Sequence, residues 1–128
     1  MTDFWTGKKV LITGASGFIG THLCAELAKY DCELFTPSSN DFDLRDADES
    51  EWLLQDYCQA PDVLINLAAN VGGIGYNKNH PYSLFYDNIQ IGVNLIHAAI
   101  AYKVKKFVQI STVCSYPKFT PVPFREEA

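Results

Sequence analysis

The sequence predicts an α/β fold in which helices flank a single parallel sheet. Short apolar runs suited to buried parallel strands recur along the chain, for example at residues 10–12 and 63–67. Segments with the apolar spacing of amphipathic helices separate these runs, and a glycine-rich turn follows the first of them. Strands that alternate with helices are typical of a parallel sheet, because each helix carries the chain back to the end where the next strand begins.

The composition limits the number of domains and the kinds of partner. With 128 residues, of which 48% are hydrophobic, the chain can bury one core, so we expect one domain spanning residues 1–128. A formal net charge of -5 without a run of basic residues argues against nucleic acid as a partner, because a phosphate backbone demands clustered Lys and Arg.

The chain shows neither a membrane span nor the layout of a signal peptide. No stretch reaches the roughly 18 consecutive apolar residues of a spanning helix, and Asp3 interrupts the amino terminus. We therefore expect a cytoplasmic protein that does not bind membranes. The 4 cysteines lack the Cys-x-x-Cys spacing of metal sites, which predicts reduced thiols and no bound metal.

Gly14, Gly17 and Gly20 follow the first apolar run at a spacing of three residues. Gly14 allows a sharp turn at the carboxyl end of the strand, and Gly17 allows backbone N–H groups and the next helix to approach a pyrophosphate closely. Gly20 allows that helix to pack tightly on the strand. A glycine turn that binds nothing is the alternative, but the order strand, turn, helix, strand favours a dinucleotide cradle.

The remaining elements are predicted from apolar periodicity and from helix-terminating and turn residues. The first helix runs to about Tyr30, and Asp46 caps the second helix, with Glu49 three residues further on. The predicted ranges are 33–36, 63–67 and 105–112 for strands, 70–80 for a glycine-rich loop and 81–103 for the longest helix. We expect a Rossmann-like sheet with strand order 3-2-1-4, truncated before its last strands, because a doubly wound fold needs a second half.

The segment after the second strand bears on the choice of cofactor. An acidic residue about 20 positions beyond the glycine motif would bind the ribose of NAD, and a nearby Arg would bind the 2′-phosphate of NADP. Neither is in the expected place, since Asp41 and Asp43 fall slightly late. Ser38 and Ser39 can hydrogen-bond a phosphate or can form an ordinary serine turn. NADP is therefore slightly preferred over NAD.

Two later segments suggest a binding loop and an interface. The glycine-rich loop follows the carboxyl end of a strand, where ligands gather in parallel sheets, although it can also be a plain connector. The long helix has two apolar faces, so it is expected to pack on the sheet and on another helix or subunit, which predicts a homodimer. Asn88 and His97 are expected to be satisfied core polar groups. The two faces comprise Phe85, Ile89, Val93, Ile96 and Ile100, and Leu84, Ile91, Leu95 and Ala98.

Three motifs together resemble a known family. The glycine turn at 13–20, Asn66-Leu67-Ala68-Ala69 and the segment at 112–118 occur in the order found in extended short-chain dehydrogenases of the NAD-dependent epimerase/dehydratase family. The motifs at 71–74 and 114–118 are similar to those of its GDP-L-fucose synthase and nucleotide-sugar epimerase branch. The resemblance covers residues 9–127.

This resemblance implies a nucleotide-sugar substrate and an NADP(H) cofactor. The adenine would lie beside Asp43 and Leu44, and the nicotinamide near Ala68 and Thr112. Thr112 would hydrogen-bond the 4-oxygen of the sugar, and Cys114 would move protons at C3 and C5, unless Cys114 is a small core residue. The implied cofactor residues are Gly14, Ser16, Gly17, Phe18, Ile19, Ser38, Asp43, Leu44, Leu67, Ala68, Ala69, Asn88 and Ser111, and the implied substrate residues are Val71, Gly72, Gly73 and Lys118.

The chain departs from the family at its catalytic Tyr-x-x-x-Lys motif, which relatives carry on a helix after the Thr112 strand. The only match, Tyr102 to Lys106, precedes that strand. We therefore expect an amino-terminal, NAD(P)-binding portion that lacks the substrate domain and is catalytically incomplete by itself. The alternative is a non-catalytic NADP-binding or regulatory module that acts through a partner.

Overall fold

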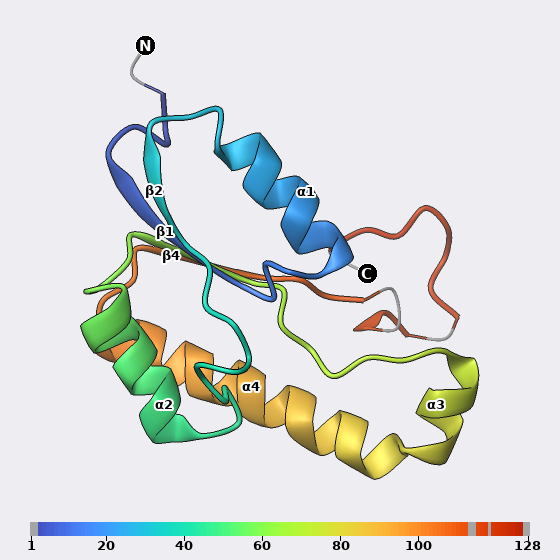
Figure 1. Cartoon of the computed structure of the whole chain (residues 1–128). Helices are drawn as coiled ribbons and strands as arrows, with labels where there is room; N and C mark the ends of the chain where they lie inside the picture. The colour runs from blue at the N-terminus through green and yellow to red at the C-terminus, as the bar shows by residue number, and fades with distance from the viewer. Residues whose placement is uncertain (1–2, 113–114, 118, 127–128) are drawn as a thin grey trace.

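The computed structural model describes residues 3–112, 115–117 and 119–126, which form one parallel sheet with helices on both faces (Figure 1). The predicted α/β fold class is confirmed. A π-helical turn (Leu53–Tyr57) continues α2. The strands are β1 (Lys8–Thr13), β2 (Cys32–Phe35), β3 (Val63–Asn66) and β4 (Lys106–Gln109), and the helices are α1 (Phe18–Leu27), α2 (Ala47–Trp52), α3 (Ile74–Asn79) and α4 (Pro81–Ala101).

The predicted strand order 3-2-1-4 is wrong, because the observed order is β2-β1-β3-β4. Val10 of β1 is paired with Val63 of β3, on the side of β1 opposite to β2. The segment after β2 forms a turn, as predicted, in which the N–H groups of Asp41 and Phe42 donate to the carbonyl of Ser38. The chain then passes through α2 to the other side of β1. The alternation of strands and helices predicts a crossover between parallel strands. It does not predict on which side of β1 the next strand pairs.

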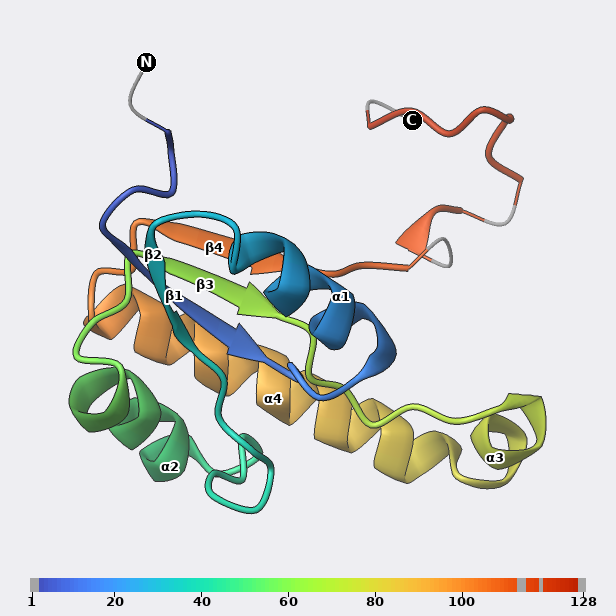
Figure 2. The same ribbon diagram turned by 45° about the horizontal axis from the view of Figure 1, so that its top comes forward.

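The sheet is buried on both faces. The side chains of Val10, Leu11 and Ile12 are fully buried, and they alternate between two cores. Leu11 packs in the core under α2 and α4, whereas Val10 and Ile12 pack in the core under α1. Figure 2 shows α1 on one side of the sheet and α2 and α4 on the other.

Helix boundaries follow the predicted pattern with local differences. The Asp46 cap is confirmed, since its carboxylate accepts the N–H groups of Asp48 at 2.8 Å and Glu49 at 3.2 Å. The first helix ends at Leu27, before Tyr30, and the strand predicted at 105–112 is limited to β4. The region predicted as a loop at 70–80 contains α3, a short helix without a buried residue.

The two apolar faces predicted for α4 have different environments. Ile91, Leu95 and Ala98 are buried in the core, so that face is confirmed. The other face is uncovered, with Val93 57% and Ile100 74% exposed. The prediction for His97 is wrong, because its side chain is exposed on the solvent side of the helix. Among the described residues, no helix is long and apolar enough to cross a membrane.

We predict that Gly20→Ala destabilises the fold by about 2 kcal/mol, because overpacking at a fixed backbone contact costs about this much. A Cβ at Gly20 would lie 2.4 Å from the carbonyl oxygen of Gly14 and 2.6 Å from the backbone of Ala15. Urea unfolding followed by circular dichroism measures the change. Gly92→Ala is the matched control: this helix position has nothing within 4 Å of the added atom, so stability should rise by about 0.5–1 kcal/mol. Equal effects at both sites would contradict the packing argument.

Candidate cofactor site

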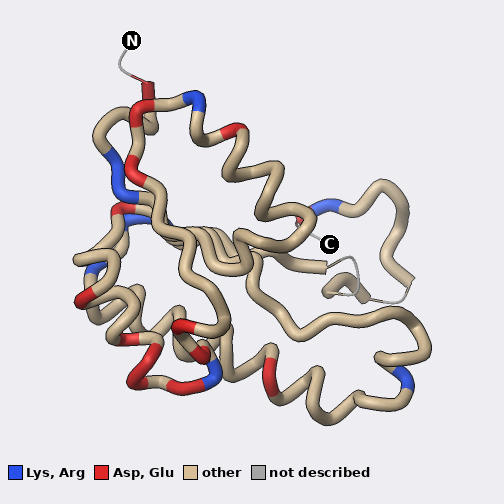
Figure 3. The backbone as a smooth tube through the Cα atoms, in the orientation of Figure 1, with Lys and Arg blue, Asp and Glu red and all other residues tan. Residues whose placement is uncertain are grey.

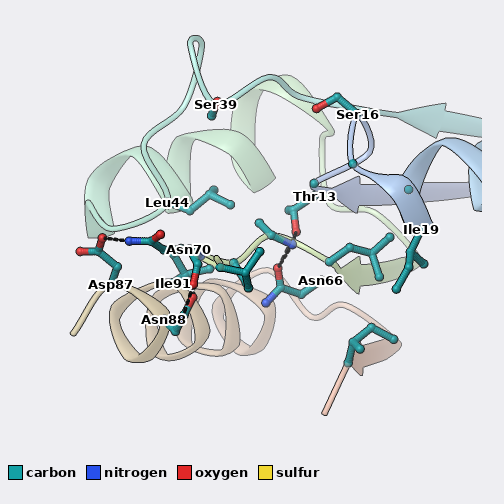
Figure 4. A pocket seen from close by; sticks show the side chains of 18 of the residues that line it. Thr13, Ser16, Ile19, Ser39, Leu44, Asn66, Asn70, Asp87, Asn88 and Ile91 are labelled. Carbon is teal, nitrogen blue, oxygen red and sulfur yellow. Dashed lines mark hydrogen bonds between the residues drawn. The ribbon is translucent and has the colours of Figure 1, made fainter. Parts of the chain in front are cut away.

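A pocket of about 1140 Å³ opens at the carboxyl ends of the strands (Figure 4). Five parts of the chain line it: the turn after β1 with the start of α1, the segments that follow β2, β3 and β4, and the amino-terminal half of α4. This volume exceeds that of most pockets for drug-sized ligands, and it lies where parallel sheets bind nucleotides. All the residues predicted to bind a cofactor line this one pocket, namely Gly14, Ser16, Gly17, Phe18, Ile19, Ser38, Asp43, Leu44, Leu67, Ala68, Ala69, Asn88 and Ser111.

The glycine turn has the backbone that the sequence predicts. Gly14 has φ +68°, and a Cβ there would lie 2.7 Å from the backbone of Leu67. Gly17 precedes the first residue of α1 in an extended conformation, and a Cβ would lie 3.3 Å from the Gly14 oxygen. The first turn of α1 has no acidic side chain, so its positive end remains available to an anion. These features fit a pyrophosphate group.

A row of hydrogen bonds joins the ends of three strands beneath the turn. Thr13 Oγ1 donates to Asn66 Oδ1 at 2.5 Å, and Asn66 Nδ2 donates to Gln109 Oε1 at 2.8 Å. The N–H of Ala68 donates to the same Asn66 oxygen at 3.1 Å. Thr13 and Asn66 are buried, and the row fixes the exit of the chain from β3. Sequence reasoning missed this row, although polar residues at the ends of apolar strands could have indicated it.

An ion-paired corner forms the wall after β2. Arg45 holds the Asp43 carboxylate with two nitrogens, its Nε at 2.9 Å and Nη2 at 2.7 Å from the carboxylate oxygens. The guanidinium keeps the pKa of Asp43 low, at about 2. Arg45 Nη1 also lies 3.6 Å from Asp87 on α4. Figure 3 shows further acidic residues gathered around α2. Arg45 and Asp87 were missed, because nothing in the sequence pairs residues so far apart.

The segment after β3 is held against α4. Asn70 and Asn88 form a reciprocal pair: Asn70 N–H donates to Asn88 Oδ1 at 2.7 Å, and Asn88 Nδ2 donates to the Asn70 carbonyl at 2.9 Å. Asn88 is therefore a satisfied polar group, as predicted, but it is half-buried and not part of the core. It lines the pocket as well.

The predicted substrate and catalytic residues are only partly brought together. Val71 and Thr112 line the pocket, but Gly72 and Gly73 do not. Gly72 instead lies against the Tyr76 ring, where a Cβ would approach within 2.3 Å. Cys114 and Lys118 lie outside the described residues.

This structure has a parallel sheet, a glycine turn between its first strand and first helix, and a pocket at the strand ends. Together these features define the Rossmann-like class of nucleotide-binding folds. The model of the NAD dependent epimerase/dehydratase family matches residues 10–128. The chain belongs to this family.

Several proteins similar to this chain have names that refer to GDP sugars. The chain is 36% identical over 110 residues to GDP-L-colitose synthase of Yersinia pseudotuberculosis, covering 86% of this chain and 35% of that protein. It is 35% identical over 120 residues to GDP-L-fucose synthase of Azorhizobium caulinodans, covering 94% and 38%. A GDP-L-fucose synthetase of Naegleria fowleri solved with NADP superposes with a TM-score of 0.79 at 26% identity, over 99% of this chain and 38% of that one. The chain thus spans little more than a third of these relatives.

We predict that Arg45→Gln raises the pKa of Asp43 from about 2 toward its ordinary value near 4. Because the folded-state pKa lies below the unfolded one, the ionised carboxylate stabilises the fold above pH ~4, and this contribution is lost as the pH falls from ~4 to ~2. Both side chains are about half exposed, so the contribution should stay below about 1 kcal/mol. Carbon-13 NMR titration of the carboxyl group measures the shift. An unchanged titration in the variant would show that another group holds the pKa down.

Proposed function

We propose that this chain is the NAD(P)-binding portion of a nucleotide-sugar epimerase/reductase similar to GDP-L-fucose synthase, in which C3/C5 epimerisation and 4-keto reduction of GDP-4-keto-6-deoxymannose belong to the complete enzyme. The glycine turn carries this proposal: it opens into the large pocket at the strand ends, and α1 begins there without an acidic neighbour. Family membership and relatives named for GDP-sugar synthesis support the substrate class.

Each pocket segment has a role in this proposal. The turn at Gly14 and Gly17 would hold the pyrophosphate, Asp43 and Leu44 the adenine, and Ala68 and Ser111 the nicotinamide end. A bound nicotinamide cofactor supplies hydride chemistry. Thr112 would hydrogen-bond the 4-oxygen of the sugar and hold it in place. Cys114 would exchange protons at carbons next to a ketone, where C–H bonds are acidic.

NADP is the proposed cofactor in preference to NAD. The residues that line the pocket directly after β2 are Pro37, Ser38 and Ser39, and none of them carries a negative charge. A carboxylate at this position would favour the free ribose of NAD and repel a 2′-phosphate. The Naegleria fowleri structure with bound NADP agrees with this choice.

Titration calorimetry of the chain with NADPH and NADH tests the proposal. We expect both to bind, NADPH more tightly, and no turnover of GDP-4-keto-6-deoxymannose, because the Tyr-x-x-x-Lys motif does not follow β4 in this sequence. Binding of neither dinucleotide would overturn the proposed function. Turnover by this chain would refute the proposal that it is catalytically incomplete.

We predict that Ser38→Glu weakens NADPH binding about 10-fold and leaves NADH binding within about 2-fold, because a carboxylate would face the 2′-phosphate but not a ribose hydroxyl. Gln55→Glu adds the same charge at an exposed site that does not line the pocket, and should change neither affinity. Calorimetry gives both dissociation constants. Equal weakening of the two cofactors by Ser38→Glu would place the 2′-phosphate elsewhere.

We also propose that the chain forms a homodimer through α4, as its exposed apolar face suggests. Phe85, Val93 and Ile100 are each more than half exposed and recur at helical spacing. A second copy of the chain would bury this face by presenting the same face.

Val93→Glu is accordingly expected to shift the chain to a monomer, because a carboxylate would lose its hydration at the centre of the interface. Sedimentation velocity over a roughly 100-fold range of concentrations, which brackets a micromolar equilibrium, distinguishes the two states. The Gln55→Glu variant should sediment like the unaltered chain. A monomer at every concentration for the unaltered chain would refute the dimer.

A further inference from the structure

Lysines gather at the amino ends of the strands, away from the pocket. Lys8 begins β1, and Lys105 and Lys106 lie at the start of β4. The ammonium nitrogens of Lys8 and Lys106 lie 5.1 Å and 5.8 Å from the centroid of the Phe4 ring, which is 52% exposed. A ring attracts cations, so Phe4 offsets part of the repulsion between the two lysines. Figure 3 shows blue positions gathered beside the start of β1. The basic end of the sheet is defined as Phe4, Lys8, Lys105 and Lys106.

Asp62 fixes the position of this basic end and neutralises only part of it. Its carboxylate accepts Lys105 Nζ at 2.7 Å and the backbone N–H of Lys9 at 3.0 Å. Its backbone carbonyl accepts the N–H groups of Lys105 and Lys106, both at 3.1 Å. The hydrogen bond from Lys105 lowers the pKa of Asp62, so the carboxylate stays ionised at neutral pH. Lys8 and Lys106 form no ion pair with any residue that the structure describes, so both ammonium groups can meet a partner.

The solvent-facing side of α2 and of the π-helical turn after it has the opposite charge. Asp48, Trp52 and Asp56 recur every four residues, and Glu51 lies beside them. Asp48 and Asp56 are exposed, and the Trp52 side chain is 56% exposed. Residues 46–57 contain neither Lys nor Arg, so these carboxylates have no cation in their own segment. The acidic face of α2 is defined as Asp48, Glu51, Trp52 and Asp56.

The two surfaces are complementary in charge and in the chemistry of their side chains. Lysine ammonium groups are attracted to carboxylates and to the face of a Trp ring, which is the best aromatic partner for a cation. An exposed Trp is also a typical anchor residue of protein interfaces. The net charge of -5 on each chain opposes association. Salt screens this repulsion beyond about 8 Å at roughly 0.15 M ionic strength, so the charges that face each other across a contact outweigh distant ones.

We propose that the basic end of one copy of the chain docks on the acidic face of α2 of a second copy, so that the chain associates head to tail. No ion pair joins these two surfaces within the described part of one chain. The contact is heterologous and therefore differs from the proposed α4 dimer, in which two identical faces meet. It continues to further copies unless a ring closes. Neither surface lines the pocket, so the inference does not rest on the proposed function.

Sedimentation velocity of the 128-residue Val93→Glu variant tests this contact, because the variant keeps both charged surfaces and disrupts the exposed apolar face of α4. At about 20 mM salt we expect the mean sedimentation coefficient to rise with protein concentration. At about 300 mM salt the association should be at least roughly 10-fold weaker, because screening acts on contacts between exposed charges. Association that strengthens with salt would be apolar and would contradict the inference.

Exchange of charges between the two surfaces gives the sharpest test. In the same background, Lys8→Glu with Lys106→Glu should abolish association, because two acidic surfaces then meet. Glu51→Lys with Asp56→Lys should abolish it as well, because two basic surfaces then meet. An equimolar mixture of these two proteins should associate again, since every surface of one finds its complement on the other. Misfolding of either protein would not be corrected by mixing.

Matched controls separate the contact from the net charge. Lys29→Glu with Lys78→Glu makes the same change in net charge at two exposed lysines outside both surfaces, and should leave association unchanged. Trp52→Ala should weaken association about 3-fold, which is the usual effect of one exposed cation–π contact. Circular dichroism checks that each variant is folded.

Each outcome supports or overturns the inference. A chain that stays monomeric at low salt at every concentration overturns it, and so does association that survives either charge reversal. If the two reversed proteins do not associate when mixed, the unaltered chain uses other surfaces and the inference is wrong. If the chain stays monomeric but binds poly-glutamate through Lys8 and Lys106, the basic end serves a different acidic partner. Calorimetry with NADPH tests the proposed function separately, because these variants leave the pocket unchanged.

Discussion

The buried hydrogen bond between Thr13 and Asn66 is the interaction on which the site depends. These residues are direct partners in the register of β1 and β3, so the bond joins the two strands at the point where both leave the sheet. It brings the backbone of Gly14 so close to Leu67 that no side chain fits between them. The glycine turn and the segment after β3 are therefore fixed relative to each other, which a rigid ligand spanning both requires.

Helix α4 both stabilises the fold and shapes the pocket, and it uses different residues for these two roles. Its carboxyl-terminal half buries Leu95 and Ala98 against the sheet. Its amino-terminal half projects beyond the strand ends, where Asp87 and Asn88 hold the walls that follow β2 and β3. Asn94 lies between these regions and bonds the backbone at 44–45. The length of the helix thus follows from its two roles, since a helix ending at the sheet would leave both walls without support.

Local patterns predicted the parts of this structure that depend on neighbours in sequence. The apolar runs of the strands, the Asp46 cap and the positive φ of Gly14 each have a local physical cause. The strand order does not, because the side of β1 on which β3 pairs is set by the packing of the whole chain. The Arg45–Asp87 pair likewise joins residues whose separation in sequence gives no periodic pattern. Such contacts follow from the packed fold and not from propensity.

The pocket at the strand ends and the exposed apolar face of α4 around Val93 and Ile100 lie in different parts of the molecule. The pocket is lined by segments that leave the carboxyl ends of the strands and by the amino-terminal half of α4, and hydrogen bonds join these parts within the described residues. A second hollow of about 570 Å³ lies at the other end of α4, between that helix and β4, with Ile100 and Phe107 in its lining. Exposed apolar surface of this kind lowers solubility until a partner covers it. A partner bound at this hollow would not contribute residues to the pocket at the strand ends. The proposed dinucleotide site would therefore use the strand ends and the amino-terminal half of α4, whereas the proposed dimer would use the exposed apolar face of α4.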